Sequence, residues 1–247
     1  RISVRFDGTD DFLKRVNGDL QCRDFTAFIV AASTSNSGNF RAFLCAGAEG
    51  KNDYQSGFNI DQGAFESTQF EVINVEGAGF GGMQDLWIGV PQPLGTFHLI
   101  EASASEKTVQ VIVDGLLPGN TRTRETKPLS LDVLTLGARQ LVTGRPFQGC
   151  LHGDIAEVLL YDRALSLDET SAVREYLLTK YEKTIEISTV DQMVAKQQLH
   201  TVEDPPPVQV FVPGFTARQL PVELSNINNL QYREDGKLYA LAYDGTI

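Results

Sequence analysis

The stretch that most constrains the fold is residues 153–183, because its hydrophobic pattern changes period halfway. Residues 155–161 form a short apolar run rich in branched side chains, which is typical of a buried strand. The second half predicts an amphipathic helix lying on the sheet. Its inward-facing stripe is expected to be Val173, Tyr176, Leu177 and Tyr181. A sheet therefore ends here and a helix closes it.

The start of this helix carries a capping signal. Ser166 can accept a hydrogen bond from the exposed N–H groups of the first turn, and Glu169, three residues on, can reach back to Ser166. The carboxylates of Asp168 and Glu169 also favour the positive end of a helix dipole. We expect a capping box at Ser166.

Upstream of Ser166 the chain contains short apolar runs separated by Asn, Ser and Gly clusters, and no long helical pattern. The runs begin at residues 2–6 and continue at 25–32, 40–46, 57–60, 69–75, 85–90, 96–102, 108–113 and 131–136. Their spacing predicts an all-β, antiparallel two-sheet sandwich. With 247 residues and 42% hydrophobic residues, the chain can bury a core of that size.

The closing segment also resembles a known family. The letters G-x-I-A-E-V-L-L-Y-D-R-A-L-S at 153–166 and Y-L-x-x-K-Y at 176–181 are similar to the C-terminal signature of laminin-G-like domains of the concanavalin A-like superfamily. Three further stretches resemble that family in the same order: FDGTDDFL at 6–13, DFTAFIVA at 24–31 and TVQVIVDG at 108–115. The resemblance implies a jelly-roll sandwich over residues 1–182 with one C-terminal helix packed on it, and it implies export from the cell.

The remaining residues predict a linker and a partly extended tail. Residues 183–207 end in three consecutive prolines, which cannot donate hydrogen bonds and favour an extended chain. Residues 208–247 carry strand signals, with a hairpin turn expected at 234–236. This incomplete β segment resembles the start of a sugar-dehydrogenase-like β-propeller, as found beside laminin-G-like domains in large exported bacterial proteins. The start at Arg1, without Met, favours a mature or excised portion of such a protein.

Charge and composition exclude several classes of partner. With 21 basic and 32 acidic residues the formal net charge is −11, so a nucleic-acid backbone is disfavoured. No apolar run reaches the roughly 18 residues of a membrane span. Cys22, Cys45 and Cys150 cannot all pair within one chain and form no C-x-x-C motif, so we expect buried free thiols.

Catalytic patterns are weak. The superfamily includes glycan hydrolases, which resemble one another in placing paired carboxylates on one face of a strand. Here the acidic pairs are five residues apart, which sends the two side chains to opposite faces of a strand. These pairs are Glu66 with Glu71, Glu101 with Glu106, and Glu157 with Asp162. The chain has three histidines but no G-x-S-x-G motif that would supply a serine nucleophile. Hydrolysis is therefore the least favoured function.

The one cofactor that the sequence suggests is a structural Ca²⁺ at the rim, as the resemblance implies. The candidate ligands are Asp7, Asp10 and Asp154, with Asp11 beside the first two. Many relatives carry Asp after the Ile of the closing motif, but Ala156 stands there in this chain. That difference argues against the family's standard ion site.

Sugar recognition needs an exposed aromatic plane beside hydrogen-bonding groups. Trp87 alternates with Leu86 and Ile88 along a strand, so its ring can point outward, the alternative being core packing. Asn52, Asp53 and Tyr54 share a polar turn that is either a binding group or an ordinary solvated turn. These four residues are the candidate ligand-binding set.

We interpret the chain as a non-catalytic binding module of a larger exported bacterial protein, contacting glycan or protein. The alternative is a structural spacer that docks a downstream β-propeller.

Overall fold

The computed structural model describes residues 3–82, 85–115, 117–118, 120–141, 147–182 and 185, together with two strands at 227–232 and 238–242. The chain divides into two compact units, Arg1–Met193 and Val194–Ile247. The first unit is the sandwich, and the second contains the two isolated strands.

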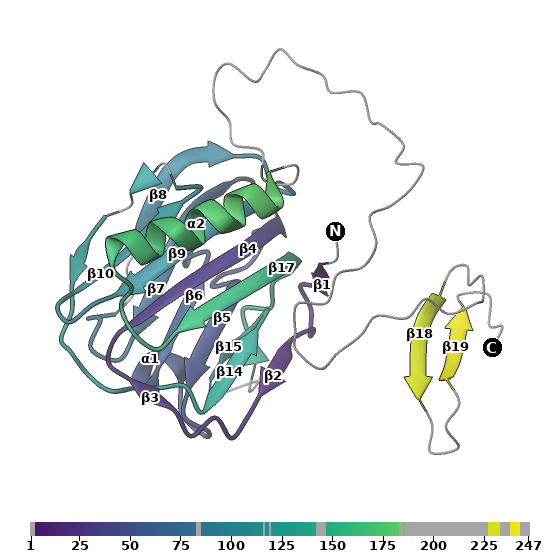
Figure 1. Cartoon of the computed structure of the whole chain (residues 1–247), viewed down its shortest axis with the longest axis horizontal. Coiled ribbons are helices and arrows are strands. Elements are labelled where there is room, and N and C mark those ends of the chain that lie inside the picture. The colour runs from purple at the N-terminus through teal and green to yellow at the C-terminus, as the bar shows by residue number, and fades with distance from the viewer. Residues whose placement is uncertain are drawn as a thin grey trace, which may run out of the picture. The chain divides into compact units, whose positions relative to one another are not determined.

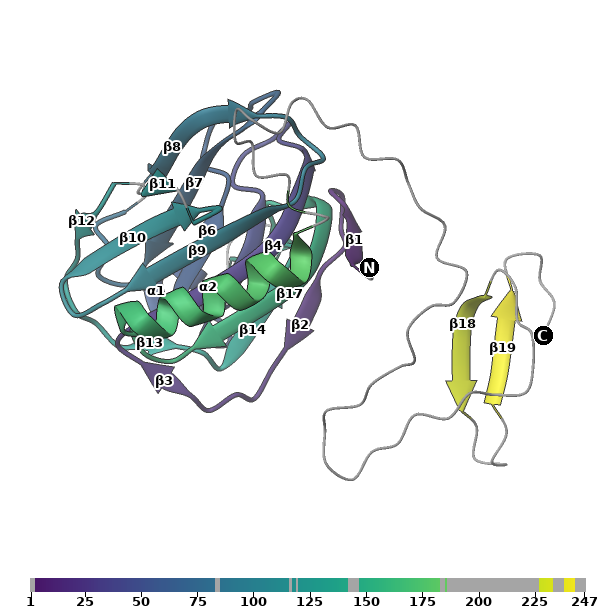
Figure 2. The same cartoon turned by 45° about the horizontal axis from the view of Figure 1, so that its top comes forward.

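One sheet of the sandwich, sheet A, is antiparallel throughout and has the order β1-β17-β4-β9-β10-β11, with β12 also paired to β10. Its strands are β1 (Val4–Asp7), β4 (Phe25–Ser35), β9 (His98–Ala104), β10 (Thr108–Val113), β11 (Leu117–Pro118), β12 (Arg122–Thr123) and β17 (His152–Tyr161). The long strands β4 and β17 lie side by side in its interior, with β1 on the other side of β17 (Figures 1 and 2).

The second sheet, sheet B, has the order β2-β14-β5-β6-β7-β8 and is also antiparallel. Its strands are β2 (Leu13–Arg15), β5 (Ala42–Gly47), β6 (Phe58–Asp61), β7 (Phe70–Gly77), β8 (Asp85–Gln92) and β14 (Val133–Leu136). Short pairs join β3 (Gln21–Cys22) to β13 (Leu129–Ser130) and β15 (Arg139–Gln140) to β16 (Phe147–Gln148). The expected all-β, two-sheet sandwich is confirmed.

The core lies between the inner faces of the two sheets. Alternation along β4 sends Ala27 and Ile29 inward, where they meet Phe58 and Ile60 of β6 in one hydrophobic cluster. The rings of Phe25 and Phe58 stack across this layer with centroids 3.9 Å apart. The cysteines lie in this sandwich as buried free thiols, as expected, and burial raises the pKa of Cys45 to about 12.

Helix α2 (Leu167–Tyr181) covers the outer face of sheet A (Figure 1). The capping box is confirmed: Glu169 N–H donates to Ser166 Oγ over 3.3 Å, and Ser166 N–H donates to Glu169 Oε2 over 2.9 Å. Leu177 and Tyr181 are buried against the sheet, but Tyr176 is 53% exposed. The predicted stripe was wrong at Tyr176, which instead contacts Lys180 on the helix surface.

In the second unit, β18 (Ile227–Tyr232) and β19 (Leu238–Ala242) pair antiparallel, as the hairpin prediction requires. The expected turn at 234–236 lies outside the described residues, as does nearly all of the expected linker at 183–207. The domain edge at 182 and the propeller resemblance stay predictions. Among the helices that the structure describes, none is both long and apolar enough to cross a bilayer.

Candidate functional site

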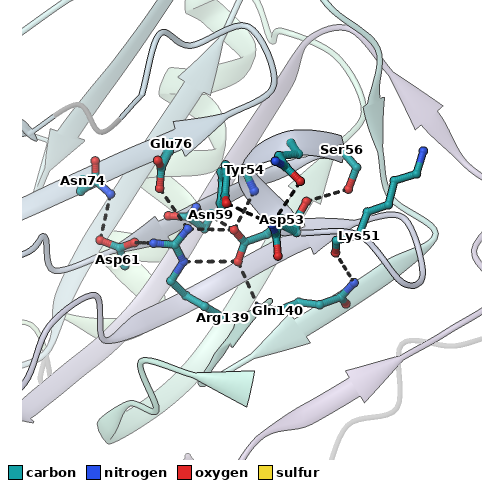
Figure 3. Close-up of polar contacts among 12 residues, drawn as sticks. Lys51, Asp53, Tyr54, Ser56, Asn59, Asp61, Asn74, Glu76, Arg139 and Gln140 are labelled. Atoms are coloured by element: carbon teal, nitrogen blue, oxygen red, sulfur yellow. Dashed lines mark hydrogen bonds and ion pairs between the residues drawn. The ribbon is translucent and has the colours of Figure 1, made fainter. Parts of the chain in front are cut away.

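The outer face of sheet B is polar, unlike its inner face. Along β6 and β7 the residues in the core are apolar, whereas polar side chains on the other face include Asn59, Asp61, Asn74 and Glu76. The register sets Asn59 opposite Glu76 and Asp61 opposite Asn74, so the four side chains form one patch. Helix α1 (Asp53–Ser56) and strand β15 cover this patch (Figure 3).

Arg139, at the start of β15, is the centre of the patch. Its Nη2 donates to Asp53 Oδ1 over 2.8 Å and to Glu76 Oε2 over 2.9 Å, and its Nε donates to Asp53 Oδ2 over 3.3 Å. Its Nη1 lies 3.7 Å from Asp61 Oδ2. One guanidinium therefore bridges three carboxylates from three different elements (Figure 3).

Asp53 is fully buried and its carboxylate is saturated. Besides Arg139, Oδ1 accepts hydrogen bonds from Tyr54 N–H and Asn59 Nδ2, and Oδ2 accepts one from Gln140 N–H. The expectation that Asp53 contacts a ligand was therefore wrong. Asp53 fixes α1 to β15 instead.

Burial dominates the electrostatics of this group. Desolvation raises the pKa of Asp61 to about 7, against the opposing effects of Arg139 and of hydrogen bonds from Gly63 N–H and Asn74. Desolvation works against the charged form of Arg139 too, but its bond to Asp53 and the three nearby carboxylates hold its pKa above the ordinary value. Arg139 is therefore always a cation, while Asp61 titrates near neutral pH.

A cavity of about 380 Å³ opens directly over Arg139. Its lining combines aromatic, charged and amide side chains: Asn39, Phe40, Tyr54, Glu76, Arg139, Leu141, Gln148 and Gly149. The Arg139 guanidinium carbon lies 5.1 Å from the Phe40 ring centroid and 5.9 Å from that of Tyr54. Two half-buried rings thus flank a charged floor, within cation–π range.

Phe40 is held there by its backbone. Its φ is +54°, a left-handed conformation unusual for an aromatic residue, and its N–H donates to Gly63 O over 2.6 Å. A Cβ at Gly149 would collide with the carbonyl of Phe40, so the two chain segments touch closely. The ring's place at the cavity rim depends on this contact.

Tyr54 lines the cavity, as the ligand-binding prediction requires. Asn52 supports it from behind, because its Nδ2 donates to Tyr54 Oη over 3.0 Å and to Gln55 Oε1 over 3.1 Å. Asn52 is itself buried, so it positions the ring and offers little surface to a ligand.

Trp87 does not lie at this site. It is 2% exposed and packs on Phe70 with ring centroids 5.4 Å apart. Its neighbour Leu86 is also buried, so β8 is covered on both faces at this point and alternation does not bring either side chain to solvent. The expectation of an outward Trp87 was wrong, and the core-packing alternative holds.

Only some of the acidic residues that were expected to hold calcium lie close together in the structure. Asp7, Asp10 and Asp11 are exposed, and their carboxylate oxygens lie within 4.8 Å of one another. The N–H groups of Thr9 and Asp10 already bind Asp7 Oδ1, and chiefly the Thr9 bond lowers the pKa of Asp7. Calcium binding stays a prediction.

Asp154 does not join this acidic group. Its two carboxylate oxygens accept hydrogen bonds from Arg5 Nε and Nη2 over 3.1 and 3.0 Å, so it forms an ion pair across β1 and β17. The expected ligand set of Asp7, Asp10 and Asp154 is therefore corrected.

The fold described above is an antiparallel two-sheet sandwich, and comparison of the sequence with family models identifies its family. Residues 7–171 match the laminin-G-like family model described as the concanavalin A-like lectin/glucanases superfamily. The chain belongs to this family. A comparison with curated protein sequences finds no match.

Solved structures share the fold at low sequence identity. A SAP-like pentraxin from Limulus polyphemus is 17% identical with a TM-score of 0.56, over 70% of this chain and 81% of that one. The CBM40 of Ruminococcus gnavus IT-sialidase, bound to α2,3-sialyllactose, is 16% identical with a TM-score of 0.52, over 70% and 96%. At such identities the similarity establishes the architecture alone.

Proposed function

We propose that this sandwich is a non-catalytic module that binds a glycan in the cavity over Arg139. The observation that carries the proposal is the pairing of the half-buried Phe40 and Tyr54 rings with polar groups in one cavity of about 380 Å³. Sugar C–H faces pack on aromatic rings, and sugar hydroxyls need the hydrogen-bonding partners that Glu76, Asn39 and Gln148 offer.

The arrangement of carboxylates supports binding over hydrolysis. Hydrolysis requires two carboxyl groups facing one sugar bond. Among the described residues that line the cavity, Glu76 is the single carboxylate, since Asp53 and Asp61 are fully buried beneath Arg139. A sugar in the cavity would therefore meet one acid.

Calorimetry and affinity electrophoresis on a panel of polysaccharides and cell-wall oligosaccharides test the proposal. Tyr54→Ala is expected to weaken binding about tenfold, because an aromatic contact worth about 0.5–1.5 kcal/mol is lost together with the apolar area that the ring buries. Phe65→Ala is the matched control, since Phe65 is 77% exposed elsewhere on the surface. Binding unaffected by Tyr54→Ala, or no binding to any glycan, would contradict it; the second result would favour a protein partner.

We further infer that the module belongs to a larger exported bacterial protein. The family resemblance supports export, and the antiparallel β18–β19 pair is compatible with the start of a sugar-dehydrogenase-like propeller. Detection of the protein in the periplasmic or culture-medium fraction of its source cells tests the location.

The alternative function, a spacer that docks a downstream propeller, has its own test. If residues 183–247 dock on the sandwich, a chain ending at Glu182 should unfold at a lower temperature than the full chain. An unchanged transition temperature would remove the docking function and leave the binding function untouched.

A further inference from the structure

The cavity over Arg139 also carries information on the charge of its ligand. We propose that it selects amino sugars, in which a protonated amine contacts Glu76, over acidic sugars. This rests on the proposed glycan-binding function and adds the chemical class of the ligand.

Arg139 has no free pair of parallel N–H groups to offer a ligand. An arginine that recognises a carboxylate or sulfate presents two parallel N–H groups to it. Here Nε and Nη2 are occupied by Asp53 and Glu76, and Nη1 faces Asp61. With Nε and Nη2 occupied, the guanidinium keeps no pair of parallel N–H groups for an anionic ligand, although Arg139 lines the cavity.

The charges around Arg139 also favour a cationic ligand. Three carboxylates surround one guanidinium, so the group is net negative whether Asp61 is protonated or ionised. Arg139 is the only cationic side chain among the described residues that line the cavity. The nearby Arg41 is engaged by the backbone carbonyls of Ser37, Gly8 and Cys150.

The site offers favourable contacts to a cation. The Glu76 side chain is 17% exposed, and it reaches the cavity from β7. An ammonium group there would gain a charge-assisted hydrogen bond, and the Phe40 and Tyr54 rings would add cation–π attraction. An acidic sugar would instead lose the hydration of its carboxylate and face like charge.

The expected ligand therefore differs from sialyllactose, the ligand bound to the Ruminococcus gnavus module of the same fold. Sialyllactose carries a carboxylate, and we expect it not to bind here. The shared architecture does not determine the charge of the cavity, which depends on Arg139 and its three acids.

The test compares trimers of matched linkage and length by calorimetry at mildly acidic pH and physiological salt: β-1,4-glucosamine, its N-acetylated form, a neutral glucose trimer and an acidic uronic trimer. The glucosamine trimer is expected to bind at least about tenfold tighter than its N-acetylated form, consistent with one added charge-assisted hydrogen bond. The uronic trimer and sialyllactose are expected not to bind.

Two variants at the site, with Glu49→Gln as the control, separate specific binding from general attraction to an acidic protein. Glu76→Gln keeps an oxygen that can accept from Arg139. It should reduce the ratio of the affinity for the glucosamine trimer to that for its N-acetylated form at least about fivefold. The exposed Glu49→Gln should leave this ratio unchanged. Tyr54→Ala should weaken the glucosamine trimer. Persistent tight binding in Tyr54→Ala would overturn the proposal, because the attraction would then be non-specific.

The failures are distinguishable. An acidic trimer that binds as well as the amino trimer, or a ratio unchanged by Glu76→Gln, overturns the charge selection while glycan binding stands. If no trimer of any charge binds, the proposed function fails with it. Circular dichroism of each variant establishes that the fold is intact.

Discussion

The outer faces of the two sheets are closed in opposite ways. Sheet A is covered by α2 through apolar contacts of Leu177 and Tyr181 with Phe28, Val30 and Leu99. Sheet B is covered by α1 and β15 through the ion group around Arg139 (Figure 3). On sheet A the ion pairs, such as Arg174 with Glu101, lie beside the apolar contact instead of replacing it.

The two closures differ in how they stabilise the fold and in the groups they leave for a ligand. Apolar burial stabilises roughly in proportion to area and leaves no donor or acceptor for a ligand. A buried ion group has to overcome the desolvation of every charge, and an apolar replacement would often be as stable. The polar closure of sheet B therefore gains little stability over an apolar one, which fits the glycan site proposed in the cavity above it.

The largest effect is expected from Arg139→Leu. It leaves Asp53, Asp61 and Glu76 without their shared cation, and breaking such a buried group typically costs about 3–5 kcal/mol of unfolding free energy. Chemical denaturation measures it. Lys127→Leu, which breaks the exposed pair with Glu125, is the control and should cost under about 1 kcal/mol. Equal losses in the two variants would mean that the buried ion group stabilises the fold no more than an exposed pair does.

Leu177→Ala should weaken the apolar closure by about 2–5 kcal/mol, through lost transfer energy and a residual cavity. The variant should retain the glycan affinity of the parent, because α2 lies on the other sheet. Tyr176→Ala, at the exposed position directly before Leu177, is expected to change stability by less than about 0.5 kcal/mol. Loss of glycan binding in Leu177→Ala while the protein stays folded would show that the two outer faces are coupled, which contradicts their expected independence.

The pH dependence of stability should report Asp61. Its folded pKa of about 7 lies above the ordinary 3.8, so between these values the native state holds a proton that the unfolded state has released. Stability therefore falls as pH rises from about 4 to about 7, with a slope of at most about 1.4 kcal/mol per pH unit for one group.

Asp61→Asn should remove this part of the slope, whereas the exposed Glu49→Gln should leave it intact. Denaturation curves at several pH values measure it. A slope unchanged in Asp61→Asn would mean that another group carries the titration.

The smallest effect is expected at the helix cap. Ser166→Ala removes the hydroxyl that accepts from Glu169 N–H, at a typical cost of about 1 kcal/mol. The transition temperature should fall by about 2–4 °C for a chain of this size. Ser171→Ala, within the same helix and exposed, should not lower it.

The closure of sheet A could be predicted from sequence because its signals are local. Ser166 and Glu169 stand three residues apart, and the apolar run before them has a strand period, so the strand, cap and helix all follow from neighbouring letters. Tyr176 was misplaced because helical spacing defines a stripe about a hundred degrees wide, and the sheet buries only its Leu177 side.

The cavity over Arg139 could be predicted only in part. Tyr54 was found because aromatic and amide residues share one turn. Phe40, Glu76, Arg139 and Gln148 were missed, since they come from separate segments and meet only through the pairing of β5, β6 and β7 and the β15–β16 hairpin. Outward Asn and Glu residues alternating on β6 and β7 were the available signal, but they do not say which cation covers them.

The contact between Gly149 and the carbonyl of Phe40 leaves no room for a side chain at position 149. Gly149 also has a φ of +57°, where any side chain is disfavoured. Any side chain at position 149 would have to move the Phe40 segment, so a change of this one glycine would displace the aromatic wall of the cavity.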